Sequence, residues 1–360
     1  MPDLGKLTRY ASAAKRVGGK PYFQQLTDLF GLATGRRRLG VSEYYELGVF
    51  DDVAFSPQLK SDCVGWRASS QIDKQLNNDF WRAMANDKVM NYALLQHYGF
   101  AIPQTIATYS PQGRCVAGEQ SLRTRPALED FLLNALQFPV FMKPIYGSYG
   151  RGTYWLDSFE SALGCFVDSH GKKVAVDELV RACLRPQFTG MLFQKCLRAH
   201  DEVRALVGTT TSCVRVIVAL PPEGPKVHTT FWKIARAHNI TDNFCMGETG
   251  NLLAALNKAS GTIERVVTGL WPDGQEVSRH PDTGSTLVGA TLPHWQEAMD
   301  MCLAAALHFP GLRLQHWDVA LCTEGPVLME LNTEADLGVP QFLGRTPFID
   351  PVIARMMKAA

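Results

Sequence analysis

Three glycines lie within six residues, shortly after a short apolar run that ends in Lys143. They are Gly147, Gly150 and Gly152, and Arg151 lies between the last two. Glycine allows backbone N–H groups to come close to a bound anion, and a polyphosphate offers several oxygens to such a loop. Lys143 and Arg151 add two cations near the same point. This combination favours a phosphate-binding loop over an ordinary turn.

The glycine loop joins two apolar runs, which indicates a hairpin. A Walker A loop and a dinucleotide-binding loop each open a helix instead. A glycine-rich loop within a hairpin is typical of lids that close over ATP. The sequence therefore predicts a nucleotide-binding lid over residues 147–152.

A second set of polar residues lies on a predicted hairpin further along the chain. A turn centred near Glu324 places Asp318 opposite Glu330, and strand alternation puts Glu330 and Asn332 on one face. Two carboxylates and an amide oxygen then converge. These are hard oxygen ligands of the kind that Mg²⁺ takes together with nucleotide phosphates. Hairpin carboxylates taken alone are more often solvated, but beside a lysine and a glycine lid we expect a magnesium site.

Two more basic residues, Lys233 and Arg236, lie three positions apart in an apolar run. In a strand they would face opposite sides, so only one could enter a site without a bulge. The histidines at 238, 280 and 316 have the chemistry of a general base. An isolated histidine is more often structural, and we assign no catalytic role to any of them.

The hydrophobic pattern places these residues on alternating helices and strands. Apolar residues at helical spacing predict helices over residues 4–17, 80–98, 126–136 and 294–308. Short apolar runs predict strands over residues 138–143, 191–196, 203–207, 213–220 and 227–234. Helices that alternate with antiparallel-looking strands predict an α+β fold rather than a continuous βαβ winding.

The first 40 residues carry eight basic side chains and two acidic ones. The helix predicted over residues 4–17 is therefore basic and amphipathic. Such a helix can lie on a membrane or meet an acidic partner. We expect the plainer alternative, a solvated helix that packs on its own domain.

Composition excludes several classes of protein. The 360 residues suffice for about two domains. Thirty-six Lys and Arg against 35 Asp and Glu leave a net charge of +1, which gives no field to attract nucleic acid. Nine scattered cysteines without zinc-type spacing predict reduced thiols in a cytoplasmic protein. No apolar run approaches the roughly 20 residues that span a bilayer, and we expect neither a secretory leader nor a transmembrane segment.

Taken together, these segments resemble the ATP-grasp fold, and most closely its sugar-transfer associated branch, which is related to α-L-glutamate ligases. The likeness covers residues from about 80 to 350. It includes Asp87-Lys88 at the head of a helix, the glycine loop, a hinge at 192–197, the segments 214–217, 242–250 and 280–284, and the hairpin up to Asn332. The resemblance implies two α+β lobes that grip ATP, after an N-terminal helical or α/β region that helps to bind the other substrates.

The resemblance also divides the chain. It implies a basic helical region over residues 1–78 and a pre-ATP-grasp region over 79–125. A first lobe with the lid would cover 126–197, and a second lobe with the magnesium hairpin would cover 198–360.

Roles carry over residue by residue. Lys88 and Lys143 would contact ATP, the lid would cover its phosphates and the hinge would meet the adenine. Glu202 would bind the ribose, with Asp201 as second choice. Many ATP-grasp chains have glutamate where this chain has Gln194, so the adenine contact departs from the family pattern there.

The implied catalytic residues include Arg215, near the transferred phosphate, and Arg236, preferred over Lys233 beside an acyl phosphate. The full sets implied by the resemblance are, for catalysis, Lys143, Arg215 and Arg236; for ATP, Lys88, Lys143, Gly147, Ser148, Tyr149, Gly150, Arg151, Gly152, Gln194, Lys195, Cys196, Leu197 and Glu202; and for Mg²⁺, Asp318, Glu330 and Asn332.

The family resemblance implies an ATP-dependent carboxylate–amine ligase that forms an amide through an acyl phosphate and releases ADP. Its substrates would be a small carboxylate and an amine, with sugar acids and amino acids as candidate classes in sugar, exopolysaccharide or amino-acid conjugate synthesis. Two other classes stay open, a kinase-like phosphotransferase and a nucleotide-binding module without turnover. A homodimer also stays open.

Overall fold

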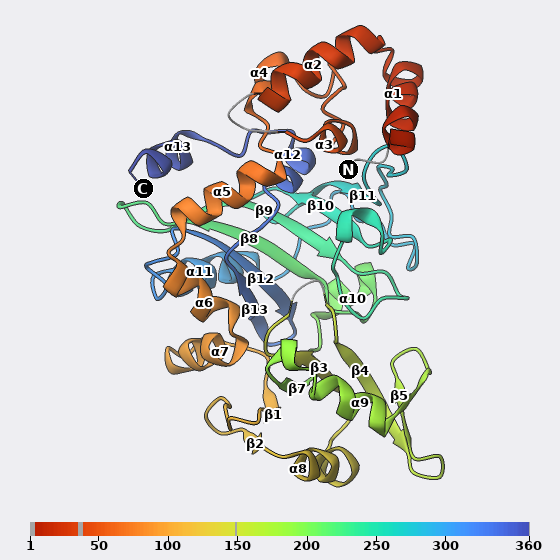
Figure 1. Ribbon diagram of the computed structural model, residues 1–360, viewed down its shortest axis with the longest axis vertical. Helices are drawn as coiled ribbons and strands as arrows, with labels where there is room; N and C mark the ends of the chain where they lie inside the picture. Colours follow the sequence, from red (N-terminus) through yellow and green to blue (C-terminus); the bar gives the residue numbers. More distant parts are fainter. Residues whose placement is uncertain (1–3, 35–38, 148–149, 360) are drawn as a thin grey trace.

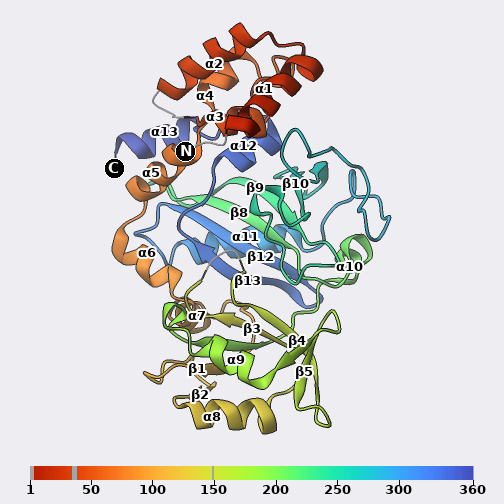
Figure 2. The same ribbon diagram turned by 45° about the vertical axis from the view of Figure 1, so that its right-hand side comes forward.

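The computed structural model describes residues 4–34, 39–147 and 150–359 (Figure 1). A helical amino-terminal region, a six-stranded sheet and a seven-stranded sheet follow one another along its long axis, and the turned view in Figure 2 shows the same order. The structure combines helices with two sheets, so the fold is α+β, as predicted. None of the described helices combines the length and apolar character needed to cross a membrane.

In the described part of the chain, all regular secondary structure before the first strand is helical. The predicted basic helix is present as α1, with Tyr10 and Ala14 buried and Lys15 and Arg16 exposed. The bounds are α1 Leu4–Gly18, α2 Tyr22–Thr34, α3 Val41–Glu46, α4 Pro57–Asp62, α5 Trp66–Leu76, α6 Asp79–Asn86 and α7 Lys88–His97.

The single helix predicted over residues 80–98 is two helices, α6 and α7. They are separated at Asp87, whose carboxylate oxygen accepts the backbone N–H groups of Val89 and Met90, each at 3.1 Å. A side chain that accepts these N–H groups is a helix N-cap and stabilises the start of a new helix. This cap sets Lys88 at the first position of α7.

The first lobe is the seven-stranded sheet, in the order β2-β1-β7-β3-β4-β5-β6. Its helices cover a core that includes Phe131, Phe166 and Phe193. The bounds are β1 Thr105–Tyr109, β2 Gln120–Leu122, α8 Arg125–Asp130, a π-helical turn at Phe131–Ala135, β3 Val140–Pro144, β4 Tyr154–Glu160, β5 Cys165–Asp168, β6 Lys173–Ala175, α9 Val176–Cys183, a 3₁₀ turn at Pro186–Phe188 and β7 Met191–Lys195. The sheet begins at Thr105, before the predicted start of this lobe at 126, and the domain divisions stay predictions.

The second lobe is the six-stranded antiparallel sheet, in the order β11-β10-β9-β8-β12-β13. One face packs on α11, and the other packs on the N-terminal helices together with α12 and α13. The bounds are α10 Asp201–Val207, β8 Cys213–Ala219, β9 Lys226–Ile234, a 3₁₀ turn at Cys245–Gly247, β10 Leu252–Leu256, β11 Ile263–Val267, α11 Trp295–Ala306, β12 Leu314–Cys322, β13 Gly325–Asn332, α12 Gly338–Gly344 and α13 Pro351–Lys358.

Burial on both faces explains the composition of β12, in which every residue is buried. Trp317 packs with α11, while Leu314 packs with the N-terminal side. A charged residue in such a strand needs a partner. Asp318 is therefore held by its neighbours in the sheet, and this requirement organises the site described below.

The strand predicted over residues 203–207 is wrong, because this segment is helix α10. Val203 and Val207 are both buried and lie four positions apart, which puts them on one helical face. His200 Nδ1 accepts the backbone N–H of Glu202 at 3.3 Å at the start of this helix. A short apolar run does not distinguish a strand from a buried helical turn, which is why the prediction failed.

Candidate active site

A cavity of about 1490 Å³ lies between the two sheets and extends to the N-terminal helices. Both predicted polar groups line it, the lysines near the glycine loop and the hairpin carboxylates. Its volume exceeds the roughly 300–1,000 Å³ of a typical single-ligand pocket. The cavity therefore has room for more than one bound molecule.

The hairpin has the predicted register, with Asp318 on β12 paired with Glu330 on β13. The register shifts directly after this pair, so that Met329 is an extra residue on β13. Arg215 on β8 pairs with Asp318 from the other side of β12. Its Nε and Nη2 donate to the two carboxylate oxygens at 2.6 and 3.0 Å, which is a bidentate ion pair.

Lys233 on β9 joins the same network. Its Nζ lies 3.1 Å from Asp318 Oδ2 and 3.1 Å from Asp242 Oδ1. Burial alone would raise the pKa of Asp318, but Arg215 and Lys233 outweigh burial and lower the pKa to about 2. Burial would likewise lower the pKa of Lys233, but Asp242 and Asp318 outweigh it and raise the pKa. Arg215, Lys233 and Asp318 are therefore charged at neutral pH.

Lys88, at the capped start of α7, reaches the hairpin from a helix that packs beside the second sheet. Its Nζ lies 3.0 Å from Glu330 Oε1 and donates to the carbonyl of Gly147 at 3.1 Å. The cap residue Asp87 is itself paired with Arg114. This lysine therefore ties the glycine loop to the carboxylate hairpin.

Lys143 on β3 has a different environment, although it lines the same cavity. Its Nζ donates to the hydroxyl of Tyr92 at 2.5 Å, and that hydroxyl donates to the carbonyl of Met329 at 2.6 Å. Among the residues that the structure describes, no carboxylate forms an ion pair with it. Lys143 is only 8% exposed, and burial lowers its pKa.

The glycine loop lies between β3 and β4, as predicted. Gly150 has φ +66°, and a Cβ there would come within 2.9 Å of the side-chain amide of Asn243. A residue other than glycine would thus be strained and would push the loop away from the segment 241–243 of the second lobe. Gly147, Gly150 and Arg151 line the cavity, whereas Ser148 and Tyr149 lie outside the described residues. Gly152 adjoins Phe188 and does not line the cavity.

The predicted hinge lies at the end of β7 and lines a second, smaller cavity of about 90 Å³ between the lobes. Gln194 is 1% exposed there, and its Nε2 donates to the hydroxyl of Thr105 at 3.0 Å. The hinge residues that line this cavity are Gln194, Lys195, Cys196 and Leu197, with Phe141, Trp155 and Met329 as apolar neighbours. Apolar side chains of this kind suit a flat base, although the volume lies below the roughly 300–1,000 Å³ of a typical ligand pocket.

Two predicted contacts lie elsewhere. Glu202 is exposed on α10 and lines neither cavity, and Asp201 is paired with Arg198 and Arg204 at 3.1 Å each. The ribose contact expected from either acid has no support in this geometry.

The geometry favours Lys233 over Arg236, and the role of either residue stays a prediction. Strand β9 ends at Ile234, so Arg236 lies beyond the strand and the alternation argument does not reach it. Its guanidinium binds Asp282 through contacts of 2.7 to 2.9 Å and does not line the cavity. Lys233 enters the site instead. The histidines at 238, 280 and 316 likewise do not line the cavity.

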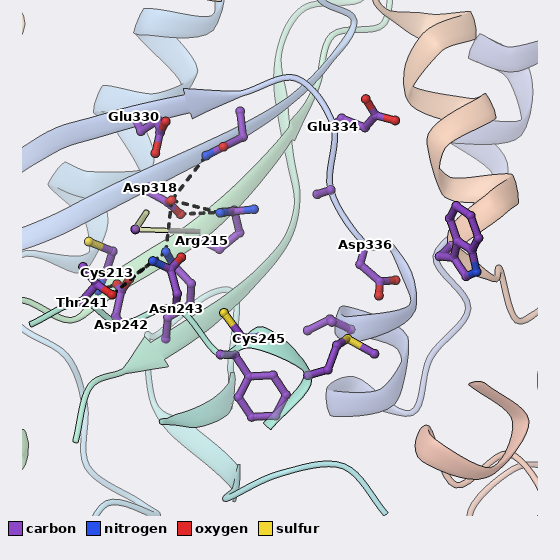
Figure 3. Close-up of a pocket in the computed structure, with 18 of the residues that line it drawn as sticks. Cys213, Arg215, Thr241, Asp242, Asn243, Cys245, Asp318, Glu330, Glu334 and Asp336 are labelled. Carbon is purple, nitrogen blue, oxygen red and sulfur yellow. Dashed lines mark hydrogen bonds and ion pairs between the residues drawn. The ribbon is translucent and has the colours of Figure 1, made fainter. Parts of the chain in front are cut away.

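Sequence reasoning missed two parts of the cavity. Asp242, the second partner of Lys233, also accepts the backbone N–H of Cys213 at 2.7 Å, and only its place in the 242–250 segment pointed to it. The far end of the cavity is formed by α3, α5 and the segment after β13, where Figure 3 shows Glu334 and Asp336 apart from the Asp318 group. Tertiary packing brings these segments together, and no local sequence motif identifies them.

The predicted magnesium ligands have the oxygen chemistry that this ion takes. In this structure both Asp318 oxygens accept from Arg215 and Lys233, and Glu330 is paired with Lys88. Asp318, Glu330 and Asn332 all line the cavity and all offer oxygen donors. Within the described part of the chain, no group of three His, Cys, Asp or Glu side chains is arranged to hold a metal. A magnesium ion here would therefore use the Asn332 amide and ligand phosphate oxygens besides the two carboxylates, as Mg²⁺ does in nucleotide sites.

Comparison with solved structures finds remote likenesses, and comparison with curated proteins finds no match. Biotin carboxylase from Campylobacter jejuni is 11% identical with a TM-score of 0.44, covering 77% of this chain and 46% of that one. An L-amino acid ligase from Bacillus licheniformis is 12% identical with a TM-score of 0.42, covering 77% and 48%. N5-carboxyaminoimidazole synthase from Aspergillus clavatus is 10% identical with a TM-score of 0.40, covering 76% and 52%. This chain thus spans about half the length of these structures, and likenesses of this size carry no argument about its activity.

A family model gives the decisive match. The model described as sugar-transfer associated ATP-grasp matches residues 67–349, which is most of the chain. The match includes both sheets, the glycine loop, the hinge and the carboxylate hairpin. It confirms the resemblance seen in the sequence and the predicted ATP-grasp fold. The chain belongs to the sugar-transfer associated ATP-grasp family.

Proposed function

We propose that this protein is an ATP-dependent carboxylate–amine ligase that works through an acyl phosphate and releases ADP. One carboxylate substrate attacks the γ-phosphorus of ATP, and the amine substrate then displaces phosphate to form the amide. Sugar acids and amino acids are the substrate classes that we propose to test first. The smaller cavity at the hinge would take the adenine, and the main cavity would take the phosphates and both substrates.

The observation that carries this proposal is the buried cation of Lys143. Burial lowers the pKa of Lys143, and the attraction of Glu330 and Asp318, which form no ion pair with it, offsets burial only in part. An anionic phosphate in the cavity would supply a counter-charge in direct contact. Lys143 therefore favours an anion as the natural ligand of this part of the cavity.

Four cations from both lobes face this region, namely Lys88, Lys143, Arg215 and Lys233. In phosphoryl transfer the protein acts chiefly by positioning and by offsetting the charge that spreads over the phosphoryl oxygens. Arg215 and Lys233 are fixed by Asp318, so they are preorganised and need little rearrangement when charge develops. Mg²⁺ held by Asp318, Glu330 and Asn332 would offset phosphate charge as a Lewis acid.

The glycine loop has a second role in this proposal. An acyl phosphate that meets water hydrolyses, so the site must exclude water during the reaction. The loop contacts segment 241–243 of the opposite lobe at Gly150 and is linked to the hairpin through Lys88. We propose that it closes the cavity from the first lobe once the substrates are bound.

A screen of pooled amino acids and sugar acids tests the proposal. It measures ADP release that requires both a carboxylate and an amine. A ligase releases phosphate in step with amide formation. A stable phosphorylated product would identify a kinase-like phosphotransferase instead. Nucleotide binding without any product across the screen would identify a binding module.

A further inference from the structure

Helix α2 presents two faces of opposite character. Its inner face is anchored by polar contacts, since Gln25 donates to the carbonyls of Lys20 and Ala11 at 2.8 and 3.1 Å and accepts from Tyr45. Asp28, on the same side, accepts from Lys20 and the hydroxyl of Tyr44. These contacts hold α2 firmly against the rest of the N-terminal region.

The outer face of α2 is apolar and exposed. Phe23 is 79% exposed, Leu26 66% and Phe30 75%. At about 100° per residue these three side chains fall within roughly 60° of one another around the helix. The sequence of α2 contains a single charged residue, Asp28, and that residue faces inward. Large apolar side chains that cluster on one exposed face mark an interaction surface.

Cations border this apolar face on one side. Lys15 and Arg16 lie exposed in the last turn of α1. The Lys15 Nζ lies 4.8 Å from the centre of the Tyr22 ring, and the hydroxyls of Ser12 and Tyr22 are 3.3 Å apart. Tyr22 begins α2, so the basic end of α1 adjoins the apolar face. In the sequence, three further arginines, 36 to 38, follow shortly after α2.

We propose that this surface, defined by Lys15, Arg16, Phe23, Leu26 and Phe30, docks on an anionic membrane surface. An exposed apolar helix face bordered by Lys and Arg is the arrangement of helices that lie in the bilayer interface. The anionic lipid headgroups would meet the cations, and the ring and aliphatic side chains would enter the headgroup–acyl boundary. The inference goes beyond the proposed reaction and does not rest on it.

Charge decides between a membrane and a second copy of this chain. A symmetric dimer would place the same surface of two copies together and would bring the cations of both into one interface. Such like-charge contacts oppose association, whereas an anionic bilayer complements them. The position of α2 also suits a bilayer. It lies at one end of the long axis, and the first lobe lies at the other end (Figures 1 and 2).

Co-sedimentation of the full chain with vesicles tests the proposal. We expect binding to vesicles of phosphatidylcholine with an equimolar share of phosphatidylserine, weakened by added salt because salt screens the headgroup charge. Two double variants should lose this binding. One combines Phe23→Ser with Leu26→Ser, and the other combines Lys15→Glu with Arg16→Glu. Phe80→Ser is the apolar control, since Phe80 is 86% exposed on α6. Lys172→Glu with Lys226→Glu is the charge control, because both lysines are exposed and far from α2 in sequence.

If the thermal midpoint of each variant is close to that of the parent, its folding is intact. No binding by the parent to phosphatidylserine vesicles would overturn the proposal. Equal binding to phosphatidylcholine alone, or binding that persists in either patch variant, would overturn it as well. A parent dimer in light scattering that becomes a monomer in Phe23→Ser with Leu26→Ser would assign the surface to a second copy instead.

Discussion

Lys143 and Lys233 line the same cavity from opposite lobes and are equally buried, yet only Lys233 is paired with carboxylates. Lys233 lies 3.1 Å from both Asp242 and Asp318. Among the described residues, Lys143 contacts the hydroxyl and the ring of Tyr92 but forms no ion pair. The two lysines therefore make opposite contributions to the free energy of unfolding.

Replacement of each lysine by methionine, which is similar in length, separates these contributions. Lys143→Met should leave the stability of the protein without nucleotide unchanged or raise it, because a costly buried charge is removed and Tyr92 keeps its bond to Met329. Lys233→Met should lower stability by about 3–5 kcal/mol, because two buried carboxylates lose a partner. Urea unfolding monitored by circular dichroism measures both. A destabilised Lys143→Met protein would contradict the assignment of Lys143 as an uncompensated cation.

Magnesium and ATP together should raise the thermal midpoint of the parent protein. A ligand that binds only the folded state stabilises it by about 2.7 kcal/mol at one hundred times its dissociation constant. EDTA should remove most of the gain, and Lys143→Met should show little gain at all. An unchanged midpoint at millimolar magnesium and ATP would contradict the nucleotide assignment.

Glu330→Gln is the cleaner of two tests of the magnesium hairpin. Among the described residues, Glu330 forms an ion pair with Lys88 alone, and its side chain is 34% exposed, so the neutral amide should abolish turnover with little loss of stability. Asp318→Asn should also abolish turnover, but it removes the carboxylate that Arg215 and Lys233 share and should lower the thermal midpoint. Turnover within a few-fold of the parent in Glu330→Gln would place the metal elsewhere.

Stability should also depend on pH through Glu43 at the far end of the cavity. Burial raises the pKa of Glu43 from its ordinary 4.5 to about 7, and nearby Asp336 and Glu46 add to the increase. Folding then favours the protonated form, so the stabilisation is fully present below pH 4.5 and is lost as the pH rises through 7. The loss amounts to about 3 kcal/mol at most.

Chemical denaturation of the parent and of Glu43→Gln across this pH range provides the measurement. The variant changes the absolute stability, because the glutamine amide cannot accept both backbone N–H groups that Glu43 accepts from Gly40 and Trp66. The informative quantity is therefore the slope with pH. Parallel slopes for parent and variant would exclude Glu43 as the source.

Much of the site could be predicted because its motifs are local. The pairing of Asp318 with Glu330 agrees with the prediction, but the turn alone does not produce it. Symmetric pairing from the turn matches Val319 with Leu328, and the bulge at Met329 then brings Glu330 opposite Asp318. The glycine loop between two strands follows from neighbouring residues. The lysine of the 138–143 run sits in β3 beside the loop for the same reason.

Other features depend on contacts distant in sequence. The choice between Lys233 and Arg236 turns on where β9 ends, which the apolar pattern does not define to within two residues. Helix α10 was predicted as a strand because two valines at positions 203 and 207 suit either structure when both are buried. The far end of the cavity joins α3 and α5 to the chain after β13, and only the folded structure brings them together.

Trapping with hydroxylamine tests the central claim most directly. With a carboxylate that supports ADP release, and hydroxylamine in place of the amine, we predict a hydroxamate together with ADP, because a small strong nucleophile intercepts an acyl phosphate. Lys143→Met and Glu330→Gln should form neither product. AMP and pyrophosphate in place of ADP would contradict the account, because attack would then occur at the α-phosphorus. A stable phosphorylated product that hydroxylamine does not cleave would contradict it too, and would identify a kinase.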